Sequence, residues 1–308
     1  RSSGEIFHKS IQDLPDLLAP NDSLILNNTR VLPARLVGHR AATGGKWEGL
    51  YLGNDSEGRW KLIGQTRGYL QTGESVVVTA SDGRELGLKL IAREQDGVFL
   101  FTPSQPESAV DLLQKFGTLP LPPYFDRKTP DANDWERYQT VYAKEPASSA
   151  APTAGLHFTP QLLADLASRG VEMARVELVV GLDTFRPVSA ADPREHPMHS
   201  ERYRVPPETI EACRAARRVV SVGTTSVRAV ESAATTGAPE GRTRMFIHRP
   251  YDWKVVDLLM TNFHLPRTTL LMMVDAFVGA RWRHLYDIAL AEEYRFLSFG
   301  DAMLLDRK

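Results

Sequence analysis

The sequence predicts an α/β (α+β mixed) main domain interrupted by a small antiparallel β-barrel domain. Short β-prone runs broken by Gly and Asp fill residues 44–102, which is typical of a small barrel or sandwich. After residue 150, strand-like and helix-like segments alternate, which is typical of an α/β sheet. We therefore expect a discontinuous α/β domain made of residues 1–42 and 150–308, and an inserted domain at residues 43–149 that ends in a Pro-rich connector.

The insertion is predicted from its strands and turns. The Asp82-Gly83 and Asp96-Gly97 pairs favour hairpin turns, because Gly reaches the positive φ that these turns require. A helix over Glu107–Phe116 and an extended Pro-rich segment, Leu119–Tyr124, are expected to follow the strands. The predicted strands are Gly49–Leu52, Trp60–Ile63, Ser75–Thr79, Leu86–Ile91 and Val98–Phe101.

The main domain is predicted from apolar runs and helix-end signals. Thr159-Pro160 is typical of a helix start, and Gly170 is a plausible helix end. The expected strands are Ser23–Leu26, Met173–Val180, Val219–Val222 and Val255–Met260. The further expected helices are Pro207–Arg217, Ser226–Ala234, Thr268–Val278 and Trp282–Glu292.

Composition excludes several classes of protein. Of the 308 residues, 42% are hydrophobic, which excludes disorder or coiled coil as a description of the whole chain. The single cysteine, Cys213, excludes an internal disulfide framework, and the apolar run Leu270–Val274 is too short to span a bilayer. The net charge of −1 means that any nucleic-acid binding must use a local basic surface. Because Arg1 stands first, we expect a processed or truncated start.

The segment Ala151–Thr159 is the first candidate binding loop. It is nearly uncharged and runs into a helix start, where free backbone N–H groups can bind an anion. His157 can act as an acid or a base near neutral pH. The alternative is a buried turn with a hydrogen-bonded histidine.

Two further loops follow the predicted strand Met173–Val180. Asp183 and Arg186 could bind a ribose hydroxyl and an anion at the end of that strand, or form a loop ion pair. His196 and His199 resemble half of a metal site. Because Pro197 separates them and no third ligand is evident, acid–base groups on a polar loop are the better interpretation.

Two more strands end in polar residues. Gly223-Thr224-Thr225 runs into a helix and could hold an anion, although it lacks the Gly-Lys-Ser/Thr ending of a Walker A loop. Asn262 and His264 follow the strand that ends at Met260. Taken one at a time, these signals support only an α/β enzyme with an anionic or nucleotide-like ligand.

The motifs taken together resemble one family. The chain is similar, essentially from Gly4 onward, to the bacterial S-adenosylmethionine:tRNA ribosyltransferase-isomerase (QueA) family of queuosine biosynthesis. Two motifs differ: Asn28 stands where the family commonly has Asp, and Val179 and Asp183 stand where it commonly has His and Gly. Family members also usually begin some thirty residues earlier. The motifs that carry the resemblance are Asn28–Arg35, Ala151–Thr159, Gly181–Pro187, His196–Glu201, Gly223–Arg228, Thr261–Pro266 and Tyr294–Met303.

The resemblance implies transfer and isomerisation of the ribosyl part of S-adenosylmethionine onto 7-aminomethyl-7-deazaguanine in tRNA. The product would be epoxyqueuosine, with adenine and methionine released. In such a route a base removes a C5′ hydrogen made acidic by the sulfonium, adenine leaves, the amine captures the sugar, and methionine leaves as the epoxide closes. S-adenosylmethionine is then a co-substrate, and neither a metal nor a permanently bound cofactor is required. The family leads us to expect a cytoplasmic monomer.

The resemblance also implies the site residues. The acid–base candidates are His157, His199 and His264, and the sequence does not rank them. We favour Thr224 and Thr225 for the methionine carboxylate. The candidates for binding substrate or co-substrate are Arg30, Arg35, Thr153, Gly155, Asp183, Thr184, Arg186, Glu201, Gly223, Thr224, Thr225, Arg228 and Asn262.

Two other functions remain open at this point. The first is an S-adenosylmethionine-dependent tRNA methyltransferase, although no Gly-x-Gly loop follows an early strand. The second is a non-catalytic RNA-binding protein that uses the β insertion as an oligonucleotide-binding barrel.

Overall fold

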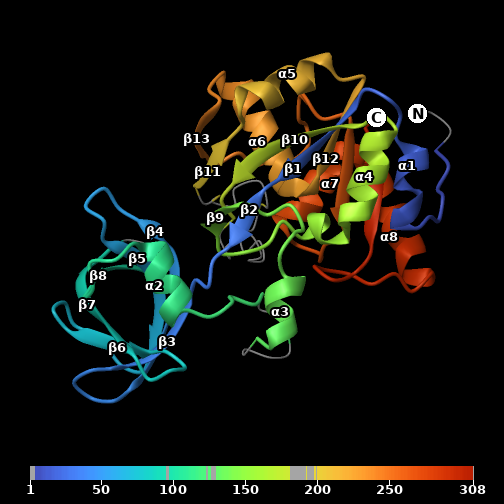
Figure 1. Cartoon of the computed structure of the whole chain (residues 1–308). Coiled ribbons are helices and arrows are strands. Elements are labelled where there is room, and N and C mark those ends of the chain that lie inside the picture. The colour runs from blue at the N-terminus through green and yellow to red at the C-terminus, as the bar shows by residue number, and fades with distance from the viewer. Residues whose placement is uncertain are drawn as a thin grey trace. The chain divides into compact units, whose positions relative to one another are not determined.

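The computed structural model describes residues 4–94, 97–122, 124–125, 130–180, 192, 198 and 200–307. Contacts divide the chain into two compact units. The α/β unit consists of residues 1–30, 137–145 and 151–308, and the barrel unit of residues 31–136 and 146–150. Figure 1 shows the elements of both units in chain order.

The α/β unit contains a seven-stranded mixed sheet. Its four central strands, β10, β1, β12 and β14, run parallel, and the flanking pairs β14·β15, β10·β11 and β11·β13 are antiparallel. In spatial order the strands are β13 (Glu240–Thr243), β11 (Glu201–Arg204), β10 (Glu172–Leu178), β1 (Asp22–Asn27), β12 (Arg218–Val222), β14 (Leu258–Asn262) and β15 (Ala302–Asp306).

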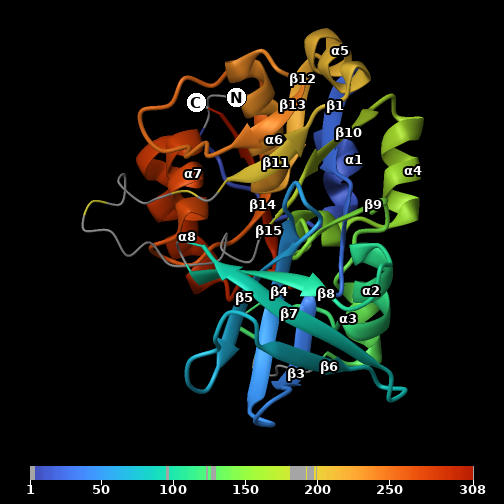
Figure 2. The same ribbon diagram turned by 90° about the vertical axis from the view of Figure 1, so that its left-hand side faces the viewer.

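Helices cover both faces of this sheet. α1 (Leu14–Leu17) and α4 (Pro160–Ser168) lie on one face, and α5 (Pro207–Ala215) and α6 (Gly223–Thr236) lie on the other (Figure 2). Right-handed crossover connections place the helices on opposite faces. The chain moves across the sheet in one direction from β1 to β10 and in the opposite direction from β12 to β14. The remaining helical elements are η1 (Ile11–Asp13), η3 (Thr153–His157), α7 (Thr269–Val278), η6 (Gly279–Arg281) and α8 (Trp282–Ala291).

The central strand β1 is buried along its whole length. Leu24 and Leu26 pack with residues of α1, α4, β12 and β14, whereas Ile25 faces the other side, as the alternation of a strand requires. At its start, Asp22 is fully buried and accepts bonds from Arg218 Nε at 3.0 and 3.1 Å. Although burial opposes the effect, hydrogen bonds from Arg218 and from the Ala19 amide hold the pKa of Asp22 below its usual value.

The helix starts follow local capping chemistry. Thr159 and Thr268 are the N-caps of α4 and α7, and each side chain accepts a bond from the backbone amide three residues on. Pro266 therefore lies before α7 and not in its first turn. α6 begins at Gly223, three residues earlier than the predicted Ser226. Gly223, Thr224 and Thr225 are consequently the first turn of the helix and not a loop before it.

The predicted strand at Val255–Met260 is displaced, because the observed strand is Leu258–Asn262. The buried carboxylate of Glu231 explains the shift. It accepts bonds from the backbone amides of Lys254, Val255 and Val256, at 3.0 to 3.1 Å, so these amides are not available to a sheet. Tyr251 donates to the same carboxylate at 3.1 Å.

The barrel unit is a closed antiparallel barrel with a core of its own. α2 (Ala109–Phe116) packs Leu112, Leu113 and Phe116 against that core, and Ser108 caps it. A separate two-stranded sheet joins β2 (Thr29–Val31) and β9 (Glu145–Ser148), and α3 spans Ala132–Arg137. In order around the barrel the strands are β3 (Arg35–Arg40), β4 (Lys46–Asn54), β5 (Trp60–Thr66), β8 (Val98–Pro103), β7 (Glu85–Arg93) and β6 (Ser75–Thr79).

The predicted fold class is confirmed: a mixed α/β sheet accompanies a closed six-stranded barrel. The expected insertion start at residue 43 falls after β3, which pairs with both β4 and β6 and belongs to the barrel. β3 has Arg35 and Arg40 at its two ends. The contact boundary lies at Val31.

We predict that the barrel loses structure independently of the α/β unit. Leu88 is fully buried in the barrel core, so Leu88→Ala should destabilise it by about 2–5 kcal/mol. Hydrogen exchange should then accelerate in β3 to β8 and stay unchanged in β1, β10 and β12. Val220→Ala, in the other core, is the matched control and should give the opposite pattern. Equal loss of protection in both units would show that they unfold as one.

Candidate active site at the ends of the parallel strands

The parallel strands β10, β1, β12 and β14 end at the same edge of the sheet, and side-chain amides stand at two of these ends. Asn27 closes β1 by donating from Nδ2 to the Leu178 carbonyl at 3.0 Å and accepting from the Leu178 amide at 3.2 Å. The same Oδ1 accepts from the Thr29 amide at 3.3 Å. Ligands of α/β sheets bind at this edge, so the candidate residues here can serve a ligand.

The η3 turn lies against the start of α6 at this edge. A Cβ placed on Gly223 would lie 3.5 Å from the Ala154 Cβ, and Gly223 has a φ of +84°. Gly at this position therefore permits the left-handed backbone, whereas a Cβ would make only an ordinary contact with Ala154. The Oγ1 atom of Thr225 is buried and has no hydrogen-bond partner among the described residues. The free amides of the first helical turn and this hydroxyl together suit an anion.

A chain of hydrogen bonds links η3 to the end of β14. Thr153 Oγ1 donates to Asn262 Oδ1 at 3.1 Å, and Asn262 Nδ2 lies 3.2 Å from His157 Nε2. With Oδ1 occupied by Thr153, the amide presents its N–H to the imidazole, so His157 accepts at Nε2 and carries its proton on Nδ1. The structure therefore brings Thr153, His157 and Asn262 together, as the loop motifs suggest.

The electrostatic environment keeps His157 uncharged at neutral pH. Burial lowers its pKa, the carboxylate of Asp301 opposes that shift, and the guanidinium of Arg295 adds to it. Asp301 accepts from the Arg295 backbone amide at 2.7 Å and lies 3.3 Å from its Nη2. An uncharged imidazole can accept a proton or a hydrogen bond near neutral pH.

His264 has a different environment. It is buried, and burial lowers its pKa to about 4. Its Nε2 lies 2.9 Å from Thr261 Oγ1, and its backbone amide donates to the Tyr286 hydroxyl at 2.9 Å. The side chain is therefore neutral and already bonded within the turn that follows β14.

Two hydroxyl-bearing residues at this site have no counterpart in the sequence motifs. The hydroxyls of Tyr142 and Thr140 are both buried, and the Tyr142 hydroxyl interacts with the Thr140 side chain. A Cβ on Gly155 would overlap the Tyr142 hydroxyl and lie 2.8 Å from Thr140 Cγ2, so Gly155 leaves the space that Tyr142 fills. Only the three-dimensional contact with Gly155 identifies these residues, because the segment around Tyr142 has no pattern of its own.

Glu201 and Arg228, both predicted to bind substrate, form an ion pair with each other. Both side chains are buried, and Arg228 Nε also donates to the Met245 carbonyl at 3.3 Å. Arg228 Nη2 has no partner among the described residues. Removing either partner of a buried pair leaves an uncompensated charge, so the pair has a structural role whatever else it contacts.

The other predicted residues are distributed more widely. Arg30 is exposed on β2, and Arg35 belongs to the barrel, where its Nε lies 2.7 Å from Glu48 Oε1. Thr224 is buried in the first turn of α6. The predicted residues Asp183, Thr184, Arg186 and His199 lie outside the described residues.

Within the described ranges, no three His, Cys, Asp or Glu side chains are grouped so that they could hold a metal ion. Across the same ranges, no helix is long and apolar enough to cross a membrane.

Comparison with known proteins identifies the family. Residues 1–305 match the profile of the queuosine biosynthesis protein family. The S-adenosylmethionine:tRNA ribosyltransferase-isomerase of Symbiobacterium thermophilum is 46% identical over 99% of this chain and 90% of its own length. The enzyme of the same name from Thermus thermophilus is 48% identical over 97% of this chain and 88% of its own.

A solved structure agrees with this assignment. The crystal structure of S-adenosylmethionine tRNA ribosyltransferase from Thermotoga maritima is 33% identical, with a TM-score of 0.52, over 99% of this chain and 89% of that one. The chain belongs to the queuosine biosynthesis protein family, and the resemblance seen in the sequence motifs is confirmed.

We predict that Gly155→Ala destabilises the α/β unit by about 1–3 kcal/mol, because the methyl group would overlap the Tyr142 hydroxyl. Thermal unfolding of the single and double variants measures this. Tyr142→Phe alone should cost about 1 kcal/mol, the loss of the interaction between its hydroxyl and Thr140, and should restore part of the stability lost in Gly155→Ala. Strictly additive effects in the double variant would contradict this account of the turn.

Proposed function

We propose that the chain acts as an S-adenosylmethionine:tRNA ribosyltransferase-isomerase. It transfers the ribosyl moiety of S-adenosylmethionine to 7-aminomethyl-7-deazaguanine in tRNA and isomerises it to epoxyqueuosine, with release of adenine and methionine. The observation that carries the proposal is the match along almost the entire chain to the family and to relatives of this activity.

The start of α6 is the proposed site for the methionine carboxylate. The helix spans fourteen residues, and its first-turn amides and the unpaired Thr225 hydroxyl are donors without a described acceptor. A helix N-terminus favours an anion by roughly 0.3–1 kcal/mol, and each hydrogen bond to a charged group adds about 1.5–3 kcal/mol. We favour a carboxylate over a phosphate here, because Thr224 and Thr225 are buried.

His157 is the proposed acid–base residue among the described histidines. Its neutral imidazole lies beside η3, and Thr153 and Asn262 fix its orientation. His264 is the proposed positioning residue of the turn after β14, since its imidazole is bonded to Thr261. Removal of the C5′ hydrogen and protonation of adenine each need such a group within hydrogen-bond reach.

One incubation tests the proposal against its alternatives. Wild-type protein, tRNA bearing the aminomethyl precursor and methyl-labelled S-adenosylmethionine should give free adenine, with the label in free methionine. A methyltransferase would place the label in tRNA, and a non-catalytic RNA-binding protein would release no adenine. Mass spectrometry of tRNA from a deletion strain should show the accumulated aminomethyl precursor.

We predict that Thr225→Val raises the KM for S-adenosylmethionine by roughly tenfold or more, the effect of losing about one hydrogen bond to a charged group. The Kd for tRNA should stay near the wild-type value. Thr235→Val, near the other end of α6, is the matched control and should change neither constant. A lower melting temperature with unchanged kinetics would assign Thr225 a structural role, and weaker tRNA binding alone would assign the turn to phosphate.

We predict that Asn262→Asp raises the pKa of His157, because a carboxylate beside Nε2 favours the protonated imidazole. In the wild-type protein, burial lowers the pKa of His157 from its ordinary value of 6.5. A rate that needs the neutral imidazole therefore decreases only when the pH is lowered below 6.5. The acidic limb of the pH profile of kcat/KM should therefore move upward by about one unit in the variant. An unmoved limb would exclude His157 as the titrating group, and Asn262→Ala separates this effect from simple loss of the bond.

A further inference from the structure

The barrel carries an aromatic–cation stack that ends in solvent. The guanidinium carbon of Arg93 lies 4.0 Å from the centre of the Tyr69 ring and 4.7 Å from the centre of the Phe99 ring. Phe99 packs against the barrel core, whereas Tyr69 is 68% exposed. Arg93 also donates to the Leu70 carbonyl, which fixes the guanidinium in the stack. Tyr69 thus keeps one face on Arg93 and leaves much of its ring open to solvent.

The loop that presents Tyr69 is anchored to the barrel at several points. Arg40 Nη2 binds both carboxylate oxygens of Glu74, at 2.7 and 3.0 Å, and its Nη1 donates to the Arg67 carbonyl at 3.4 Å. The Gly73 amide donates to the Leu90 carbonyl at 2.8 Å. A ligand that stacks on Tyr69 therefore meets an ordered ring, and little conformational entropy is lost on binding.

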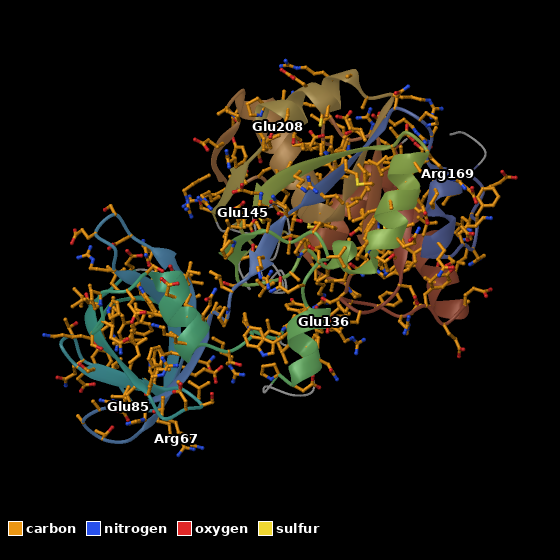
Figure 3. All side chains as sticks on the ribbon, viewed as in Figure 1. Arg67, Glu85, Glu136, Glu145, Arg169 and Glu208 are labelled. Carbon is orange, nitrogen blue, oxygen red and sulfur yellow. The ribbon has the colours of Figure 1, made fainter. Side chains whose placement is uncertain are left out.

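The charge around Tyr69 is locally positive although the barrel as a whole is mixed. Glu74 is paired with Arg40, and Glu94 with Lys61 at 3.0 Å. Among the described residues, neither Arg67 nor Arg93 has a carboxylate partner. Arg67 is exposed two residues before Tyr69, at the outer edge of the barrel (Figure 3). Arg67, Tyr69 and Arg93, which we call the Tyr69 platform, therefore combine an open aromatic face with uncompensated positive charge.

We propose that the Tyr69 platform binds an unpaired nucleotide of tRNA, with the base stacked on Tyr69 and a neighbouring phosphate held by Arg67. Bases splayed from RNA loops and ends are recognised by stacking on aromatic rings, and arginines alongside supply the contact to phosphate. The inference rests on the proposed function, which makes tRNA the substrate. It adds a contact surface on the barrel unit, formed by residues other than those at the strand ends.

Titration of fluorescently labelled tRNA against full-length variants tests the platform. Tyr69→Ala should raise the Kd by about tenfold or more, as expected for loss of one base–aromatic stack, and Tyr69→Phe should stay near wild type. Arg67→Gln should weaken binding and reduce the slope of log Kd against log salt by about one phosphate contact. The KM for S-adenosylmethionine should not change in any of these variants. Val37→Ala, an exposed apolar barrel residue outside the platform, is the control for surface truncation.

The outcomes separate this inference from the proposed function. A wild-type Kd in Tyr69→Ala overturns the platform even where the wild-type enzyme releases adenine. Equal weakening in Val37→Ala overturns it as well. If a protein partner binds the wild type but not Tyr69→Ala, while the Kd for tRNA is unchanged, Tyr69 serves that partner and the platform is also overturned. Weakened tRNA binding in Tyr69→Ala, rescued in Tyr69→Phe, supports the platform even where adenine release fails. Unchanged melting temperatures confirm that the variants fold.

Discussion

The parallel pairing of β1 with β10 on one side and β12 on the other is the constraint on which the candidate site depends. Because β14 continues the parallel arrangement beyond β12, four strands deliver their following segments to one edge of the sheet. Asn27 stabilises this edge, because its side chain donates a hydrogen bond to the Leu178 carbonyl at the end of β10 and accepts one from the Leu178 amide. Residues that are far apart in sequence, such as His157 and Asn262, meet only because these strands end in register.

The chain connections add a second constraint. α4 and α6 lie on opposite faces because the chain leaves β1 toward β10 and leaves β12 toward β14. Because these two connections run in opposite directions, neither crosses the carboxyl ends of β1 and β12. Open α/β sheets bind ligands at such a position. Here η3 and the first turn of α6 border that position, and Ala154 and Gly223 make the contact between them.

Local chemistry was sufficient to predict much of the fold. Thr159 and Thr268 cap helices through their own side chains, and the Asp82-Gly83 turn joins β6 to β7, so neighbouring residues alone carry these signals. Composition does not show that β3 belongs to the barrel, because its pairing with β4 and β6 makes it a barrel strand. The start of β14 was misplaced because a distant side chain, Glu231, withdraws three amides from the sheet.

In the candidate site, too, some features follow from neighbouring residues and others depend on contacts between distant segments. Motif reasoning located η3, the α6 turn and the end of β14, because each carries Gly, Thr, Asn or His at a strand or helix end. It did not reveal that Glu201 and Arg228 pair with each other, or that Tyr142 lies against Gly155. Both contacts join segments separated by many residues, and neither residue type specifies its partner. A charged residue in a motif can therefore serve the scaffold as readily as the ligand.

Charge pairing also determines which chemistry the described site can support. Glu201 and Arg228 compensate each other, as do Asp301 and Arg295, and the unpaired Thr225 hydroxyl is an uncharged donor. In the proposed reaction the co-substrate carries a sulfonium beside the hydrogen to be removed. An imidazolium nearby would repel that cation and would have no site for the proton. Burial avoids both problems, because it keeps His157 neutral. In the proposed site the helix start, with its partial positive charge, would receive only the distal carboxylate.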